Sequence, residues 1–320
     1  MGAITASDLG QLLPGKRGAF AEFKRAFTGL QREETISGYL FILPNVLGFL
    51  AFTIFPILFA FGITFTEWDL SKAPQFTGLQ NFATLFQDDL FWKALGNSFY
   101  YTFGAVPAGI FLAFCLALLL NQKIKGVVLF RTIYFLPQVT LVVASAMIWN
   151  WLYQPDFGLF NFLLGLVGIQ GPRWTYSTAW AMPSLIIYCN WMGIAPSALI
   201  LLAGLQGIPG ELYEAAEIDG AGSFGRLRYV TLPLMTPSLF FVVVISLIGA
   251  MQTFSQFYVL TQGGPARATT PLTLYIYQLA FSWFKMGYAS TVAAVLFVIL
   301  LILTIFQWRV ANRWVYGFSE

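Results

Sequence analysis

Six long stretches of the sequence contain no Lys, Arg, Asp or Glu, and this feature constrains the fold more than any other. They cover roughly residues 39–66, 96–120, 132–151, 179–205, 235–260 and 287–308. A helix needs about 20 mostly apolar residues to cross a bilayer. Because 58% of the chain is apolar and only 10% is charged, little polar surface remains for a soluble globule. We therefore expect an all-α, polytopic membrane protein with six transmembrane helices in a lipid bilayer.

The distribution of Lys and Arg predicts the orientation of these helices, because cytoplasmic loops carry an excess of basic residues. Twelve of the 17 basic residues fall on one side of the six stretches, namely Lys16, Arg17, Lys24, Arg25, Arg32, Lys123, Lys125, Arg131, Arg226, Arg228, Arg309 and Arg313. The other side holds Lys72, Lys93, Arg173, Arg267 and Lys285. Both termini are therefore expected in the cytoplasm.

The chain is expected to form one membrane domain with short ends. Residues 1–37 would be a cytoplasmic N-terminal segment, residues 38–310 the six-span domain, and residues 311–320 a short cytoplasmic tail. Residues 67–95 and 152–178 would be outer loops, the second with an amphipathic piece at 159–169, and residues 271–285 suggest a short interfacial or re-entrant helix before the last span.

The N-terminal segment carries apolar residues at helical spacing. Phe20, Phe23, Phe27 and Leu30 recur beside Lys24 and Arg25. This pattern fits a helix that lies on the inner membrane face, and it fits a tail with scattered phenylalanines equally well.

The residue types that most enzymes and ion-coupled carriers need are missing from the spans. The chain has no histidine, which argues against zinc, haem and Ser-His-Asp sites, so no metal site and no catalytic residue is assigned. Proton- and sodium-coupled carriers place ionisable groups at mid-membrane, and the stretches have none. Cys115 and Cys189 lie alone in apolar runs and are expected to be core residues.

A phosphate-binding loop is nearly matched by GQLLPGKR, residues 10–17, but Arg17 stands where the motif needs Ser or Thr. We treat it as a chance match and expect no cofactor in this chain.

Neutral polar and aromatic residues occur in the spans instead. Asn190 and Trp191 lie in the fourth stretch, and Gln252, Ser255 and Gln256 lie in the fifth. Amide groups hydrogen-bond hydroxyls, and aromatic faces cover the C–H face of a sugar ring, so such a lining suits a neutral polyhydroxylated solute. The same residue types also hold membrane helices together, which is the structural alternative for each of them.

The segment ELYEAAEIDGAG, residues 211–222, gathers four of the 14 acidic residues of the chain. Pro209 is favoured in a first helical turn, and Gly220 is placed to end a helix in the left-handed conformation. The segment therefore predicts a short cytoplasmic helix whose alanines and carboxylates lie against a basic partner. A solvated loop that is acidic by chance is the alternative.

The same segment resembles the EAA loop of ABC importer permeases. The residues that carry the resemblance are EAA at 214–216, DGA at 219–221 and TLP at 231–233. The full stretch ELYEAAEIDGAGSFGRLRYVTLPLMTP is similar to the version found in carbohydrate-type permeases, the maltose permease family. Leu227 departs from this family, which often has an aromatic residue there.

Three further stretches agree with that subfamily. They are GLQNFATLFQDDLFWKALGNS (78–98), FLPQVTLVVASAMIWNWLY (135–153) and FYVLTQGGP (257–265). The resemblance thus covers roughly residues 38–310.

The resemblance implies a transporter of several subunits with different roles. This chain and a second permease subunit, typically a different chain, would form the path, and an extracytoplasmic solute-binding protein would deliver the solute. Two ATP-binding subunits, which hold ATP and magnesium, would dock beneath the two permeases, and the helix of the EAA loop at 207–233 would sit in a cleft of the ATPase. The coupling residues would be Glu211, Glu214, Ala215, Ala216, Asp219 and Gly220.

The resemblance also places the substrate path. Its candidate residues are Asn190, Trp191, Met192, Gly193, Pro196, Gln252, Phe254, Ser255 and Gln256. The implied function is import of a sugar (an oligosaccharide, monosaccharide or polyol) across a bacterial or archaeal cytoplasmic (inner) membrane, with no enzymatic activity and no nucleic acid partner. The alternatives are a permease for phosphorylated polyols such as glycerol 3-phosphate, a self-sufficient channel or facilitator, and a membrane-embedded enzyme.

Overall fold

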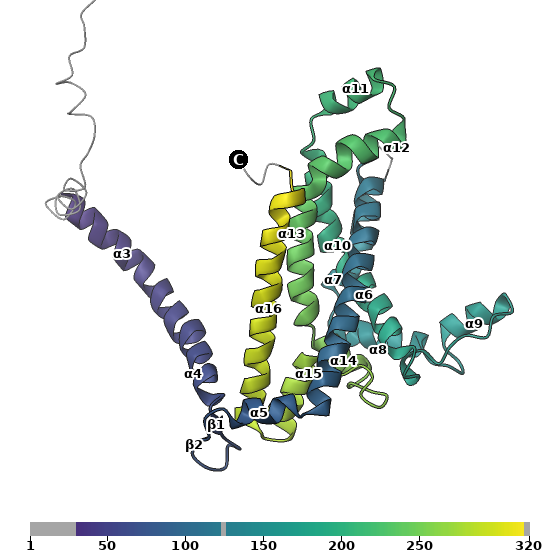
Figure 1. Ribbon diagram of the computed structural model, residues 1–320. Coiled ribbons are helices and arrows are strands. Elements are labelled where there is room, and N and C mark those ends of the chain that lie inside the picture. Colours follow the sequence, from purple (N-terminus) through teal and green to yellow (C-terminus); the bar gives the residue numbers. More distant parts are fainter. Residues whose placement is uncertain (1–29, 123–125, 317–320) are drawn as a thin grey trace, which may run out of the picture. The chain divides into compact units, whose positions relative to one another are not determined.

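The computed structural model describes residues 30–122 and 126–316 (Figure 1). The chain divides into two compact units, Met1–Gly62 and Ile63–Glu320. The segment Gly10–Arg17 and the interfacial helix predicted around Phe20–Phe27 lie outside the described residues.

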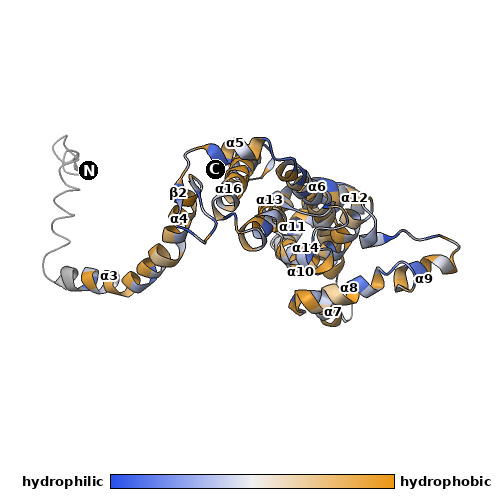
Figure 2. Cartoon of the chain, turned by 90° about the horizontal axis from the view of Figure 1, so that it is seen from below, coloured by the Kyte–Doolittle hydropathy of each residue, from blue (hydrophilic) through white to orange (hydrophobic). Residues whose placement is uncertain are grey.

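The described part of the first unit is a long apolar helix. It consists of α3 (Leu30–Phe49), a π-helical turn η1 (Leu50–Ile54) and α4 (Phe55–Ile63). In the π-helical turn, the Phe55 N–H donates to the Leu50 carbonyl five residues back, just before Pro56, whose missing N–H interrupts the regular pattern. Figure 2 shows apolar residues along most of its length, as expected of a helix in lipid.

Four long helices form the core of the second unit (Figure 1). They are α6 (Asp89–Leu120), α10 (Ala181–Gln206), α13 (Leu232–Met251) and α16 (Met286–Trp314). The most extensive packing joins α6 to α10, and α13 packs on α6, α10 and α16. Ala113 and Ala117 of α6 are fully buried against Leu201 and Met235. Such small residues let membrane helices approach closely.

The described residues contain five helices that are long and apolar enough to cross a membrane, and six if one bent pair counts as a single span. The five are Glu34–Ile63, Asp89–Leu120, Ala181–Gln206, Ser223–Met251 and Met286–Trp314. The prediction of an all-α, multi-pass membrane protein is therefore confirmed.

The third predicted span is not one straight helix. Helices α7 (Val127–Val139) and α8 (Val142–Leu152) meet at an angle of 98°. Thr140 and Leu141 between them are extended, with ψ of 141° and 128°. Pro137 lacks the N–H that would continue the helical pattern. The prediction of a continuous helix over 132–151 is therefore wrong.

The fifth predicted span, 235–260, is wrong at both ends. Helix α12 (Ser223–Arg226) and a π-helical turn η3 (Leu227–Thr231) lead into α13, which ends at Met251. A separate helix, α14 (Ser255–Leu260), follows the break. There Thr253 Oγ1 turns back to the Gly249 carbonyl at 2.9 Å. Neutral polar residues interrupt the apolar run at this break, namely Gln252, Thr253, Ser255 and Gln256, but none is charged, so the charge-free stretch extends past the break.

Short elements lie at the two ends of the four-helix core. At one end are α11 (Gly210–Ile218) and α12, and at the other are α5 (Gln80–Phe86) and α15 (Leu272–Tyr277) (Figure 1). The remaining elements are the antiparallel strands β1 (Thr66–Glu67) and β2 (Gln75–Phe76), helix α9 (Leu159–Leu166), the 3-10 turn η2 (Trp174–Tyr176) and the π-helical turn η4 (Gln278–Ser282). The short helix predicted within 271–285 is thus confirmed, and the amphipathic piece at 159–169 also contains a helix.

Asp88 ties together the helices at the α5 end. Its Oδ1 caps α6 by accepting from the Leu90 N–H at 2.9 Å. Its Oδ2 accepts from the hydroxyls of Tyr275, in α15, and Tyr288, in α16, the latter at 2.6 Å. Burial raises the pKa of Asp88, but the hydrogen bonds from Tyr275, Tyr288 and the backbone outweigh burial and hold this pKa below its usual range. The ionised carboxylate therefore joins three helices.

Candidate functional site

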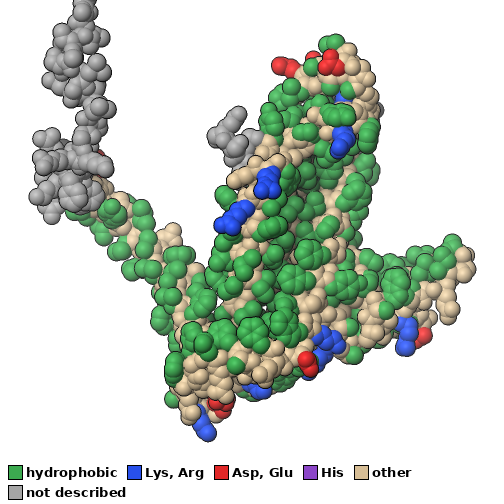
Figure 3. Space-filling model, viewed as in Figure 1, with side chains coloured by type: hydrophobic (Ala, Val, Ile, Leu, Met, Phe, Trp, Pro, Cys, Tyr) green, Lys and Arg blue, Asp and Glu red, His purple; other side chains and the backbone are tan. Residues whose placement is uncertain are grey.

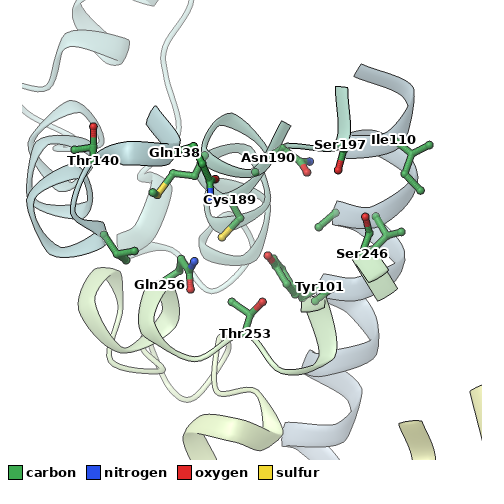
Figure 4. Close-up of a pocket in the computed structure, with 17 residues that line it drawn as sticks. Tyr101, Ile110, Gln138, Thr140, Cys189, Asn190, Ser197, Ser246, Thr253 and Gln256 are labelled. Carbon is green, nitrogen blue, oxygen red and sulfur yellow. The ribbon is translucent and has the colours of Figure 1, made fainter. Parts of the chain in front are cut away.

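A cavity of about 310 Å³ lies among α6, the α7–α8 bend, α10, α13 and α14 (Figure 4). Its polar lining residues are Tyr101, Gln138, Thr140, Cys189, Asn190, Ser197, Ser246, Thr253 and Gln256. Its other lining residues are Ala105, Val106, Gly109, Ile110, Val142, Met192, Gly193 and Ala250. None of these described residues is charged. The cavity therefore offers hydroxyl and amide groups inside a largely apolar bundle.

Both helix breaks contribute to this cavity. Gln138 and Thr140 come from the α7–α8 bend, and Thr253 and Gln256 flank the break between α13 and α14. Non-helical backbone at membrane depth is tolerated where it is buried in protein or lines a cavity. The two helix breaks thus bring polar groups into the cavity.

Hydrogen bonds to neighbouring helices hold both breaks in place. Tyr188 of α10 donates to the Val142 carbonyl at 3.2 Å, and its hydroxyl lies 2.8 Å from Ser145 Oγ. Thr273 Oγ1 of α15 donates to the Thr253 carbonyl at 2.6 Å. These contacts fix the first turn of α8 against α10 and the end of α13 against α15.

Gly109 lets α6 pass close to Asn190 of α10. A Cβ atom at position 109 would lie 2.6 Å from Asn190 Oδ1, which is closer than real Cβ contacts. Figure 4 shows Tyr101, Cys189 and Gln256 reaching into the same space from three helices. The site can therefore offer hydrogen-bond donors and acceptors from several sides to a solute with many hydroxyl groups.

The nine predicted path residues separate into two groups. Asn190, Met192, Gly193 and Gln256 line the cavity. The other five do not, and they are Trp191, Pro196, Gln252, Phe254 and Ser255.

The aromatic members of the second group contact other aromatic rings. Trp191 packs on Trp149, with ring centroids 5.2 Å apart, and Phe254 stacks on Tyr258 at 5.4 Å. Gln252 and Ser255 are exposed.

Several lining residues were not predicted, notably Tyr101, Gln138, Thr140, Ser197, Ser246 and Thr253. They come from five different segments, so no single motif contains them. Their signal in the sequence is the same one that singled out Asn190, a neutral polar side chain inside an apolar stretch.

The predicted acidic helix is present as α11, Gly210–Ile218. It ends as the sequence indicates, because Gly220 has a φ of +79°. The Gly220 N–H donates to the Glu217 carbonyl at 3.0 Å, and the Ala221 N–H donates to the Ala216 carbonyl at 2.8 Å. This pair of bonds is the Schellman motif, which needs the left-handed conformation that glycine adopts without strain.

The predicted coupling residues are largely accessible. Glu211, Glu214, Ala215, Asp219 and Gly220 are exposed, and Ala216 is half-buried. Figure 3 shows acidic side chains gathered at this end of the second unit.

Large apolar side chains are exposed beside these acids. Ile218 is 87% exposed, Tyr229 78% and Phe224 76%. An exposed apolar surface with acidic groups is typical of a protein-docking site.

Comparison with known proteins agrees with these features. Residues 105–315 match the family described as binding-protein-dependent transport system inner membrane component. The probable ABC transporter permease protein YesP of Bacillus subtilis is 38% identical over 294 residues, covering 90% of this chain and 94% of the relative. The trehalose/maltose transport system permease protein MalF of Thermococcus litoralis is 35% identical over 288 residues, covering 88% and 96%.

A solved structure shows the same fold. It is a bacterial alginate ABC transporter in complex with an alginate pentasaccharide-bound periplasmic protein, and one of its chains matches with a TM-score of 0.78 at 23% identity, covering 90% of this chain and 98% of that chain. The relatives named above are transport components and not enzymes. The chain therefore belongs to the family of binding-protein-dependent transport system inner membrane components, the permease subunits of ABC importers.

Proposed function

We propose that this chain contributes to the translocation path for a neutral sugar, and that ATP hydrolysis by a separate subunit drives the transport. The observation that carries the proposal is the cavity, in which hydroxyl and amide side chains from several helices converge without a charged group among the described lining residues. Relatives named for trehalose and maltose, lactose, and arabinooligosaccharides support the solute class.

A phosphorylated polyol such as glycerol 3-phosphate fits this cavity less well. A phosphate in a buried site needs a basic partner, because burying an unpaired charge is costly. None of the lining residues supplies one. A neutral monosaccharide, oligosaccharide or polyol, by contrast, can form hydrogen bonds with the amide and hydroxyl groups of the lining through its own hydroxyl groups.

The coupling to ATP hydrolysis would run through the EAA loop at 207–233. Glu211, Glu214 and Asp219 present carboxylates on the exposed face of α11 and at its end. A basic surface of the ATP-binding subunit would pair with them, while ATP and magnesium stay in that subunit. The distribution of basic residues supports cytoplasmic placement of this loop, of residues 1–37 and of residues 311–320.

The complete importer would contain two permease subunits, two ATP-binding subunits and an extracytoplasmic solute-binding protein in the bacterial or archaeal inner membrane. Closure of the ATPase dimer would switch the permease pair between two discrete arrangements. The exposed acidic and apolar side chains on α11 and beside it form a surface suited to docking another protein. A self-sufficient channel or facilitator would not need such a surface.

Uptake measurements separate the two solute classes. In cells that express the complete transporter, we expect uptake of at least one labelled neutral sugar among trehalose, lactose and arabinooligosaccharides. A 100-fold excess of unlabelled glycerol 3-phosphate should leave this uptake unchanged, because a charged solute finds no counter-ion in the cavity. Uptake of glycerol 3-phosphate itself, with no uptake of any neutral sugar, would contradict the assignment.

A further inference from the structure

We propose that Tyr213 and Thr231 form a latch that transmits movement of α11 to the membrane helix α13. This inference rests on the proposed function, in which α11 is the helix that the ATPase moves. Both residues are positioning residues, since neither touches the cavity and neither belongs to the exposed acidic face.

The latch is a short chain of hydrogen bonds. The Tyr213 hydroxyl lies 3.1 Å from Thr231 Oγ1. Thr231 Oγ1 in turn donates to the Arg226 carbonyl at 3.3 Å. Either hydroxyl can donate in the first bond, and when Thr231 donates its one proton to the Arg226 carbonyl, Tyr213 is the donor to Thr231. The bond therefore joins α11 to the residue immediately before α13, 18 positions along the chain.

A second contact from α11 reaches the same segment. Glu217, one helical turn after Tyr213, pairs with Arg226 Nη1 at 3.1 Å. The Glu217 side chain is 71% exposed, and exposed ion pairs contribute little because water screens them. Thr231, by contrast, is only 4% exposed, so the Tyr213–Thr231 bond ends in a sheltered position.

The backbone between α11 and α13 contains a flexible glycine link and would by itself pass little of a movement of α11 to α13. It passes through Gly220, with φ of +79°, and the extended Gly222 before the helical segment Ser223–Met251 begins. Glycines permit large changes of φ and ψ, which makes such a link a hinge. The latch bypasses this hinge by a direct side-chain contact.

Helix α13 continues from the latch to the cavity. It starts one residue after Thr231, carries Ser246 and Ala250 in the cavity wall, and ends two residues before Thr253, another lining residue. A displacement of α11 that reaches Thr231 is therefore delivered along one continuous helix to the solute site. Without the latch, α11 could follow the ATPase while α13 stays in place.

The test compares Tyr213→Phe, Thr231→Val and Thr231→Ser in the complete transporter. The transporter is reconstituted in proteoliposomes with its solute-binding protein, and the probe is labelled trehalose or whichever neutral sugar is taken up fastest by wild type. We expect Tyr213→Phe and Thr231→Val each to lower the number of solute molecules transported per ATP hydrolysed about fivefold or more. ATPase activity should persist, and Thr231→Ser, which keeps the hydroxyl, should restore the ratio.

The controls make the result specific to the latch. Tyr100→Phe removes a tyrosine hydroxyl from an exposed position on α6 and should leave the ratio unchanged. The double variant Tyr213→Phe, Thr231→Val should be no worse than Thr231→Val alone, because Thr231→Val already removes the bond that Tyr213→Phe removes.

Three outcomes would overturn the latch. The first is a wild-type ratio in Tyr213→Phe, and the second is a Thr231→Ser variant as impaired as Thr231→Val. The third is loss of the ATP-binding subunits from purified Tyr213→Phe, which would make the residue a docking contact. If wild type itself shows no ATP-dependent uptake, the proposed function fails, and the latch fails with it.

Discussion

Replacing Glu214 by lysine together with Gly220 by proline is expected to abolish solute uptake. Proline fixes φ near −65° and has no N–H, whereas Gly220 has a φ of +79° and donates to the Glu217 carbonyl. The helix end would therefore be lost. Lysine at position 214 reverses the charge on the exposed face of α11. Since coupling between distant sites is typically worth about 5- to 150-fold, uptake should fall by about 100-fold.

Gly210→Pro is the matched control for the proline substitution. Gly210 is the first residue of α11, and a Cβ there meets no atom within 4 Å. Proline is favoured at this helical position because the N–H it removes has no partner within the helix. Uptake should be retained in Gly210→Pro. Transport and ATPase coupling that survive the Glu214→Lys, Gly220→Pro pair would show that α11 is not the coupling element.

Gly109→Leu is expected to block the solute path. A Cβ at this position already lies 2.6 Å from Asn190 Oδ1, so the larger side chain must displace Asn190 or fill the cavity. Overpacking of this kind costs about 1–3 kcal/mol, which corresponds to about a fivefold to 150-fold change in an equilibrium constant. Uptake at low solute concentration should fall by at least about fivefold, while the ATP-binding subunits remain bound.

Gly96→Leu controls for the added bulk. Gly96 lies on the same helix, is exposed, and has open space around its missing Cβ. Uptake should be close to that of wild type in Gly96→Leu. Equal uptake in the Gly109→Leu and Gly96→Leu variants would show that the solute does not pass the Gly109–Asn190 contact.

The parts of this fold that were predictable from sequence depend on local chemistry. A long apolar stretch without charged residues satisfies its backbone hydrogen bonds in a bilayer by forming a helix. This is why α6, α10 and α16 lie where the hydropathy places them. The end of α11 was equally predictable, because Gly220 is a residue type that a left-handed helix end requires.

The parts that were missed depend on contacts between distant residues. The end of α13 at Met251 is held by hydrogen bonds such as that from Thr273 to the Thr253 carbonyl, whereas the local sequence shows only neutral polar residues that a membrane helix can also carry. The cavity collects its polar groups from the breaks as well as from the helices. Asn190 and Gln256 were therefore predictable as candidates, whereas their proximity to Tyr101, Gln138 and Thr140 required the three-dimensional fold.

Reconstitution with and without the ATP-binding subunits tests the central claim most directly. Proteoliposomes that contain this chain, its permease partner and the ATP-binding subunits should accumulate a neutral sugar when ATP and the solute-binding protein are supplied. Proteoliposomes that contain this chain alone should show no solute flux above that of empty vesicles. Saturable sugar flux through the chain alone, without ATP, would contradict the account and identify a self-sufficient facilitator.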